Sequence, residues 1–277
     1  MFDRILVGLD GSEGAWRAGD LALDLAGELG SRITAVFVAD ARVVEGPAVE
    51  TLAPLWGEVS ARPFQPEVVR AYRERGSEIL AEYARRAEDR SLAPPRAILE
   101  FGVAEEVLLE EAASADLVVL GLRGEHAAAG LRGLGATLSR VLRRCSHPVL
   151  VAQGDAGAFR LPLVAYDGSE AAIHALDLAV RYARASGRAL RLVHAGGEEA
   201  EPVLDRAAAV LRDHQVEWEA ARLDSEPEDA VREALRRWGA DTLFMGASGR
   251  GRVRDLLFGS RTGTILESAG VPTFLTR

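Results

Sequence analysis

The chain has 277 residues and a formal net charge of −9, with 48% hydrophobic and 27% charged residues. This length favours two compact cores over one large core, and the composition is typical of a soluble globular protein. The acidic balance argues against nucleic acid as the main partner, because no basic stripe with interleaved aromatic residues is present. We expect no membrane partner, since no apolar run approaches the roughly 20 residues that span a bilayer.

Residue types that are missing or rare exclude several kinds of chemistry. The sequence contains no lysine, so a P-loop and Schiff-base catalysis, which both require a lysine amine, are impossible. The single cysteine, Cys145, rules out an intramolecular disulfide and a cysteine-rich zinc site, and we expect it to be a small packing residue. The first residues lack the features of a secretory signal, which predicts a cytoplasmic location.

An internal repeat organises the sequence, because residues 4–26 match residues 161–183 around a shared Asp-Gly-Ser-Glu. Each copy is predicted to begin with a short apolar strand, followed by the Asp-Gly-Ser turn and an amphipathic helix. Gly30 and Gly187 are expected to end these two helices in the left-handed conformation.

The alternation of strands and helices continues through both copies. It indicates a parallel sheet covered on both faces, so the predicted fold class is α/β with two tandem doubly wound parallel-sheet, Rossmann-like domains. A stretch rich in glycine near residue 156 sets the predicted domains at 1–155 and 156–277. In the first copy the predicted strands are 5–9, 33–38, one that opens the segment 116–124, and 147–152. Their counterparts in the second copy are 163–166, 189–194, one that opens the matching segment 241–249, and 271–276. A helix is predicted before each of the two matching segments, at 104–113 and 227–238.

A long segment, residues 41–66, distinguishes the first copy from the second. It carries four prolines, Pro47, Pro54, Pro63 and Pro66, which predict an irregular loop. Loops of this length are often functional. We consider a lid, an interface or simple packing over the neighbouring surface, and favour packing.

The second copy contains a glycine-rich loop that follows a predicted strand. Its spacing is Gly246, two residues, Gly249, nine residues, then Gly259 and Ser260. Glycines at the carboxyl end of such a strand let backbone N–H groups approach phosphate oxygens, and Gly259 and Ser260 open the last helix, whose N-terminus favours an anion. The hydroxyls of Ser260 and Thr262 could donate further hydrogen bonds. The first glycine pair alone could equally make only a turn.

An aspartate follows the first strand of each copy. Asp10 and Asp167 could each accept a hydrogen bond from a ribose hydroxyl or cap the following helix, and local sequence leaves both roles open.

These motifs together resemble the universal stress protein family, over both repeats from the first strand to the fifth. The second loop matches the family's ATP-binding spacing without a deviation. The resemblance implies that backbone groups hold an adenine, the aspartate holds the ribose, and the glycine loop holds phosphates together with Mg²⁺ or Mn²⁺. Carried over to this sequence, the nominated residues are Ala165, Asp167, Ala195, Met245, Gly246, Ser248, Gly249, Gly259, Ser260, Arg261 and Thr262.

The first copy departs from the family's loop pattern. Ten residues separate Gly124 from Gly135, and Ala136 stands where the serine hydroxyl is expected. Pairing Leu134 with Gly259 would restore nine residues but would shift the last helix out of register, so we favour an inserted loop residue. Thr137 could replace the missing hydroxyl, and Arg123 and Arg132 could neutralise phosphate. The candidate residues of this weaker ATP site are Asp10, Val38, Leu120, Gly121, Arg123, Gly124, Gly135 and Thr137.

Catalysis has little support in the sequence. The five histidines, His126, His147, His174, His194 and His214, form no metal-ligand spacing or nucleophile–base pair, so we expect structural or exposed roles for them and no enzyme activity beyond slow ATP hydrolysis. The expected function is ATP-dependent stress response or signalling. Alternatives are a nucleotide-using transferase or ATP pyrophosphatase, and an interaction protein that has lost its ligand. The resemblance also implies pairing of the two domains through their last strands within the chain, and a possible homodimer.

Overall fold

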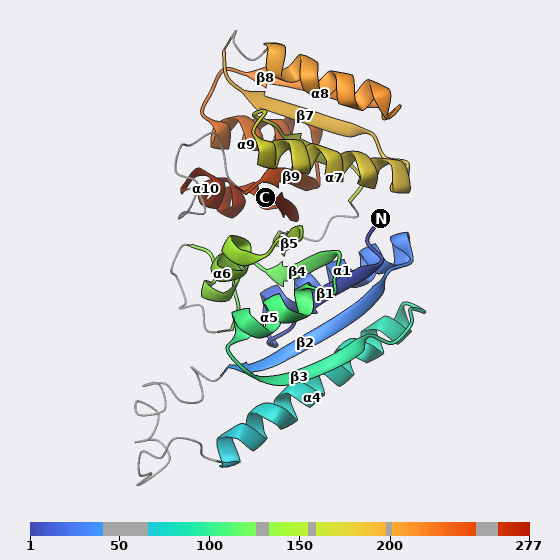
Figure 1. Cartoon of the computed structure of the whole chain (residues 1–277), viewed down its shortest axis with the longest axis vertical. Helices are drawn as coiled ribbons and strands as arrows, with labels where there is room; N and C mark the ends of the chain where they lie inside the picture. Colours follow the sequence, from blue (N-terminus) through green and yellow to red (C-terminus); the bar gives the residue numbers. More distant parts are fainter. Residues whose placement is uncertain (41–65, 126–132, 155–158, 198–200, 248–259) are drawn as a thin grey trace.

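The computed structural model of the chain describes residues 1–40, 66–125, 133–154, 159–197, 201–247 and 260–277 (Figure 1). Each half contributes five strands separated by helices. The first half comprises β1 (Arg4–Gly8), α1 (Glu13–Leu29), β2 (Arg32–Asp40), α4 (Pro66–Asp89), β3 (Arg96–Gly102), α5 (Ala104–Ala112), β4 (Leu117–Gly121), α6 (Ala136–Arg144) and β5 (Val149–Ala152). The second half comprises β6 (Pro162–Ala165), α7 (Glu170–Ser186), β7 (Leu190–Ala195), α8 (Glu201–Asp213), β8 (Trp218–Leu223), α9 (Pro227–Trp238), β9 (Thr242–Gly246), α10 (Ser260–Ala269) and β10 (Thr273–Thr276).

All ten strands form one continuous sheet, in the order β3-β2-β1-β4-β5-β10-β9-β6-β7-β8. Neighbouring strands within each half are parallel. The two halves meet where β5 and β10 pair antiparallel, with Val149 opposite Leu275 and Val151 opposite Thr273. The α/β fold class is therefore confirmed, and the last strands join the two halves as an intrachain pair.

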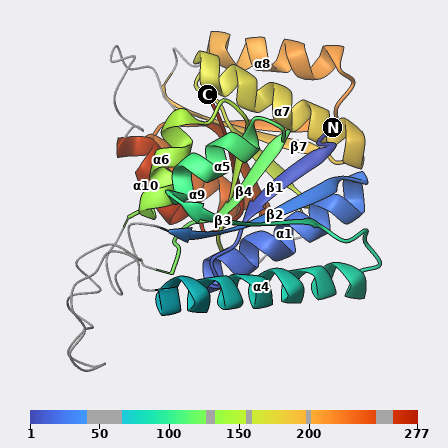
Figure 2. The same ribbon diagram turned by 60° about the horizontal axis from the view of Figure 1, so that its bottom comes forward.

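Side chains of each strand alternate between two buried layers. Ile5 and Val7 belong to the cluster that contains α1, α4, α7 and α8, whereas Leu6 belongs to the cluster that contains α5, α6, α9 and α10. Strands that are apolar on both faces are typical of a parallel sheet covered by helices. Figure 2 shows α1 and α4 along one face of the first half and α5 and α6 along the other.

Two of the predicted local features can be compared with the structure directly. Gly30 and Gly187 end α1 and α7 with φ of 71° and 68°, which confirms the left-handed caps. Pro66, which we assigned to the long loop, instead begins α4; proline fits a first helical turn because its missing N–H would have no helical acceptor there. The other prolines of that segment lie outside the described residues.

The outer strands β3 and β8 were not located from the sequence. Only Ile98 of β3 is buried, and no residue of β8 is fully buried. An edge strand contacts one neighbour and needs few apolar residues, so its hydrophobic signal is weak.

Aromatic residues pack where the two halves meet. The rings of Phe244 and Phe274 stack with centroids 4.4 Å apart, and Phe159 lies 6.1 Å from Phe274. The Tyr182 hydroxyl lies within hydrogen-bond distance of the Phe159 carbonyl (3.0 Å) and of Glu28 Oε2 (3.2 Å) on α1. Helix α7 of the second half is thus bonded to α1 of the first.

Cys145 is buried just after α6, and its burial raises the pKa of the thiol. This agrees with the predicted role as a small packing residue. None of the helices in the described ranges combines the length and apolar character needed to cross a membrane.

Candidate functional site

The strand order of each half reverses at its first strand. From β1 the chain adds β2 and β3 on one side and then returns to place β4 on the other, and β6 has the same relation to β7 and β9. Doubly wound sheets bind ligands outside the carboxyl ends of the strands at such a reversal. The candidate sites therefore lie at the ends of β1 and β4 in the first half and of β6 and β9 in the second.

The Asp-Gly-Ser turn has the same geometry in both halves. Asp10 Oδ1 accepts a hydrogen bond from the Ser12 amide, and Asp167 Oδ1 accepts one from the Ser169 amide, both at 2.9 Å. The two serines cap the following helices, with their Oγ atoms accepting backbone N–H bonds at 3.1 and 3.2 Å. The serine caps the helix, so the aspartate serves to fix the turn and to present its carboxylate at the end of the strand.

The nominated residues of the second half lie on three adjacent strands. Ala165 ends β6 and is paired with Met245 of β9, Gly246 ends β9, and Ala195 ends β7. Met245 is buried in the core, so only its backbone is available to a ligand. The structure thus brings these four positions and Asp167 to one edge of the sheet.

Gly246 also has a packing role. A Cβ atom built on it would lie 2.8 Å from the Ala171 carbonyl carbon and 2.9 Å from the Ala172 amide nitrogen. The end of β9 therefore lies directly against the first turn of α7, and a larger residue would separate the two.

The start of α10 differs in part from the prediction. Thr262 is buried, and its Oγ1 donates to the Ala247 carbonyl at 3.2 Å, so its hydroxyl joins α10 to the end of β9 rather than pointing to a ligand. Arg261 is exposed, with Nη2 3.7 Å from Glu226 Oε2. Ser260 is the first residue of α10. Ser248, Gly249, Gly259 and the side chain of Ser260 lie outside the described residues.

In the first half, the two described ends of the loop after β4 contact each other. Arg123 is exposed and donates from Nε to the Gly133 carbonyl at 2.9 Å, and the Gly135 amide donates to the Leu122 carbonyl at the same distance. Gly135 precedes α6 without a side-chain cap. Leu120 and Gly121 end β4, and Val38 lies near the end of β2. Arg132 lies outside the described residues.

The positions of the buried residues in α6 and α10, the last helix of each half, support the favoured loop alignment. Leu138, Val141 and Leu142 are the buried residues of α6, and Thr262, Ile265 and Leu266 are those of α10. This register pairs Gly135 with Gly259, which places the extra residue within the loop. Ala136 then corresponds to Ser260, and Thr137 to Arg261.

Two residues that the sequence reasoning missed surround Asp10. The Glu125 amide donates to Asp10 Oδ2 at 2.9 Å, and Arg75 of α4 lies between the two, with Nη1 2.6 Å from Glu125 Oε1 and Nη2 3.3 Å from the Asp10 carbonyl. Burial raises the pKa of the neighbouring Tyr72, and the charge of Glu125 adds to that shift. Arg75 is 65 residues from Asp10 in the chain, so no local motif could have revealed it.

The two histidines with described side-chain contacts lie at separate places in the second half. His194 is buried with Nδ1 2.6 Å from the Tyr166 carbonyl, and His174 is exposed with Nδ1 2.5 Å from the Arg277 carbonyl. His126 lies outside the described residues. Within the described ranges, no group of three or more His, Cys, Asp or Glu side chains is arranged to hold a metal ion.

Comparison with known proteins agrees with the duplicated architecture. The universal stress protein family matches residues 1–153 and 160–277. Universal stress protein Slr1230 of Synechocystis is 25% identical over 284 aligned positions, covering 99% of both chains. Rv2005c of Mycobacterium tuberculosis is 28% identical over 305 positions, covering 99% of this chain and 96% of its own.

The same fold occurs in a solved structure of comparable length. The crystal structure of a universal stress protein from Archaeoglobus fulgidus superposes with a TM-score of 0.76 at 21% identity, covering 99% of this chain and 96% of that one. Two separate matches to one family together cover nearly the whole sequence, and the fold is shared; the chain therefore belongs to the universal stress protein family and carries two of its domains.

Proposed function

We propose that the second half binds ATP together with Mg²⁺ or Mn²⁺, and that bound nucleotide sets a conformation or partner surface used in stress response or signalling. The observation that carries the proposal is the position of Asp167 and Gly246. Asp167 follows β6 and Gly246 ends β9, and these two strands are adjacent and parallel at the point where the strand order reverses. The Thr262–Ala247 bond brings the start of α10 to the same strand end.

In this proposal each part of the nucleotide has its own partner. Asp167 uses Oδ1 for the Ser169 amide, and we assign its carboxylate, which lies at the end of β6, to a ribose hydroxyl. Backbone groups near Ala165 and Ala195 receive the adenine. The glycine loop and the N-terminal amides of α10 bind the phosphates, and the cation neutralises their charge.

The first half is a weaker candidate for the same ligand. Both carboxylate oxygens of Asp10 already accept backbone hydrogen bonds. The loop is one residue longer, and Ala136 offers no hydroxyl at the start of α6. We therefore propose one strong ATP site per chain.

We propose a binding function rather than catalysis. Slow ATP hydrolysis or nucleotide transfer is the alternative, but Asp167 and Arg261, the charged residues described at the second site, are engaged with the turn and with Glu226. Neither contact positions a water against a terminal phosphate, which efficient phosphoryl transfer requires. A cytoplasmic location and a homodimer stay predictions of the sequence.

The direct experiment counts the nucleotide in the purified protein. The protein is denatured, and released nucleotide is identified and quantified per chain, before and after incubation with Mg-ATP. About one ATP per chain is expected from one strong site. About two would show that the halves are equivalent, and none after incubation would overturn the proposal.

A matched pair of variants locates the site. Gly259→Asp places a carboxylate where we expect phosphate, so the variant should lose its ATP. Gly263→Asp adds the same charge to α10 at a position with nothing within 4 Å of a new Cβ atom. This variant should retain its ATP. Equal ATP content in the two variants would mean that the phosphate loop is assigned to the wrong residues.

A further inference from the structure

We propose that Arg75 holds Glu125 against Asp10 and thereby restricts nucleotide binding at the first half. This inference rests on the proposed function, because it concerns the crevice that corresponds to the ATP site of the second half. This latch consists of Arg75 on α4, Glu125 in the loop after β4, and Asp10 after β1.

The three residues form a closed set of contacts. Arg75 Nη1 lies 2.6 Å from Glu125 Oε1, and Nη2 donates to the Asp10 carbonyl at 3.3 Å. The Glu125 amide donates to Asp10 Oδ2 at 2.9 Å. One guanidinium therefore bonds both to the strand end that presents Asp10 and to the loop that lies over it.

Gly124 lies close beside the Asp10 carboxylate. A Cβ atom built on Gly124 would lie 2.5 Å from Asp10 Oδ2. The amides of Ser12 and Glu125 each donate to one oxygen of the carboxylate, so a ribose hydroxyl would have to share an oxygen with one of them. Releasing the loop requires breaking the Arg75–Glu125 ion pair.

The sequence of the second half carries no arginine that corresponds to Arg75. Helix α4 has 24 residues and α8 has 13, and each is followed, two residues after its end, by a residue with positive φ, Ser91 and Gln215. Aligning these two ends pairs Arg75 with Glu199, which carries the opposite charge. Glu199 lies outside the described residues, so the comparison is one of sequence: the second half has no arginine at that position.

Only molecules whose site is open can bind nucleotide, so the apparent affinity equals the intrinsic affinity multiplied by the open fraction. The ion pair is partly exposed, with side-chain exposures of 40% for Arg75 and 31% for Glu125. Pairs of this kind contribute modestly, so the latch tunes the first site rather than sealing it. Its removal should raise ATP affinity at the first half without altering the second.

The latch is tested first without nucleotide, by hydrogen exchange of the full chain with mass spectrometry on peptides that contain Glu125. In Arg75→Ala and in Glu125→Gln, the Glu125 amide should exchange about threefold to tenfold faster than in the wild type. Arg73→Ala, an exposed position on the same helix, should leave the rate unchanged, as should the Ser169 amide in every variant. Unchanged exchange at Glu125 in Arg75→Ala overturns the latch.

The second measurement titrates Mg-ATP into Gly259→Asp protein, whose second site is blocked, with and without Arg75→Ala. We expect Arg75→Ala to raise affinity at the first site by about threefold to tenfold, with Arg73→Ala as control. If the Glu125 amide exchanges faster in Arg75→Ala but the wild type binds no ATP, the latch is supported and the proposed ATP-binding function is overturned. ATP binding to wild type with unchanged exchange and affinity in Arg75→Ala overturns the latch and leaves the proposed function standing.

Discussion

Asp116 and Asp241 make the same pair of hydrogen bonds in the two halves of the chain. Asp116 Oδ2 accepts from the amides of Asp3 (3.0 Å) and Arg4 (2.8 Å), and the carboxylate of Asp241 accepts from Arg160 (2.9 Å) and Leu161 (3.0 Å). Each aspartate precedes the strand that lies beside the first strand of its half. These carboxylates therefore fix the amino ends of the strands whose carboxyl ends form the candidate sites.

The first prediction concerns the contribution of Asp116 to stability. Asp116→Asn should lower the free energy of unfolding by about 1 kcal/mol at pH 7, since a neutral amide is a weaker acceptor for two backbone amides and cannot pair with Arg4. Urea unfolding measures the change. Asp205→Asn, an exposed aspartate on α8, is the control and should change little.

The same variant should also change the acid sensitivity. Burial by itself would raise the pKa of Asp116, but hydrogen bonds from Arg4, its charge and the Asp3 amide together lower it. A carboxyl whose pKa is lower in the folded state stabilises the protein above its unfolded pKa of about 3.9, and that contribution is lost as the pH falls through the folded value. The difference between wild type and Asp116→Asn should therefore shrink below about pH 4; a constant difference would contradict the assigned pKa shift.

The second prediction concerns the contact between the halves. Tyr182→Phe removes a hydroxyl that lies 3.0 Å from the Phe159 carbonyl and 3.2 Å from Glu28 Oε2. Burial raises the pKa of Tyr182, and the Glu28 charge raises it further, so the phenol remains a proton donor at neutral pH. The variant should lose about 1–2 kcal/mol of unfolding free energy, because a buried carbonyl loses its donor.

A milder variant separates the hydrogen bond from the charge. Glu28→Gln keeps an oxygen acceptor for Tyr182 but removes the charge that lies 3.6 Å from Arg188. We expect it to destabilise the protein less than Tyr182→Phe does in the same thermal or urea unfolding experiment. The reverse order would show that the ion pair, not the tyrosine, holds α1 against α7.

The third prediction uses the close approach of Gly121 and Gly14. A Cβ atom on Gly121 would lie 2.6 Å from the Gly14 carbonyl carbon and 3.0 Å from the Ala15 amide nitrogen. Backbone atoms cannot rotate away as a side chain can, so Gly121→Ala should cost about 1–3 kcal/mol of stability. Gly263→Ala in α10, where a new Cβ meets nothing within 4 Å, should instead gain up to about 1 kcal/mol from helix propensity. Equal effects of the two variants in urea unfolding would contradict this packing.

The sequence predicted most of the fold because its strongest signals are repeated. Strands buried on both faces and helices with apolar stripes stand out twice, and the caps at Gly30 and Gly187 follow from a residue preference that is purely local. The edge strands lacked such a signal. Asp116 and Asp241 were visible as identical residues before matching strands, but their backbone partners depend on strand pairing.

The candidate site was predicted less completely. The Asp-Gly-Ser turn is local, so Asp10 and Asp167 were correctly placed at strand ends. Thr262 was assigned to the ligand because its hydroxyl follows Ser260, yet burial turns it toward Ala247. Arg75 enters the first crevice only because α4 extends toward the loop, a tertiary relation that motif spacing cannot express.

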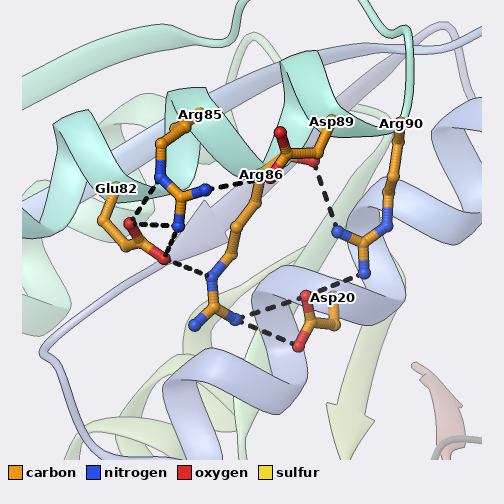
Figure 3. A network of polar contacts seen from close by, with 6 residues as sticks. All are labelled: Asp20, Glu82, Arg85, Arg86, Asp89 and Arg90. Atoms are coloured by element: carbon orange, nitrogen blue, oxygen red, sulfur yellow. Dashed lines mark hydrogen bonds and ion pairs between the residues drawn. The ribbon is translucent and has the colours of Figure 1, made fainter.

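The last prediction concerns the charged contact between α1 and α4. Arg86 bonds to Glu82 on its own helix (3.0 Å) and to Asp20 on α1 (3.3 Å), and its guanidinium lies 4.2 Å from the centre of the Trp16 ring. Figure 3 shows Arg86 reaching from α4 to α1, whereas Arg85 bonds to Glu82 and Asp89 of its own helix. Arg86 therefore connects two helices and Arg85 only one.

Arg86→Ala should lower the unfolding free energy by about 1–2 kcal/mol, because it removes a cation–π contact and an ion pair between helices. Arg85→Ala, with the same change in charge on the same helix, should have little effect since exposed pairs within one helix contribute little. Urea unfolding at low and high salt separates the two contributions: salt screens the Asp20 pair more than the Trp16 contact. Part of the Arg86→Ala loss should therefore persist at high salt. A loss that disappears completely with salt would show that Trp16 contributes nothing to holding α4 on α1.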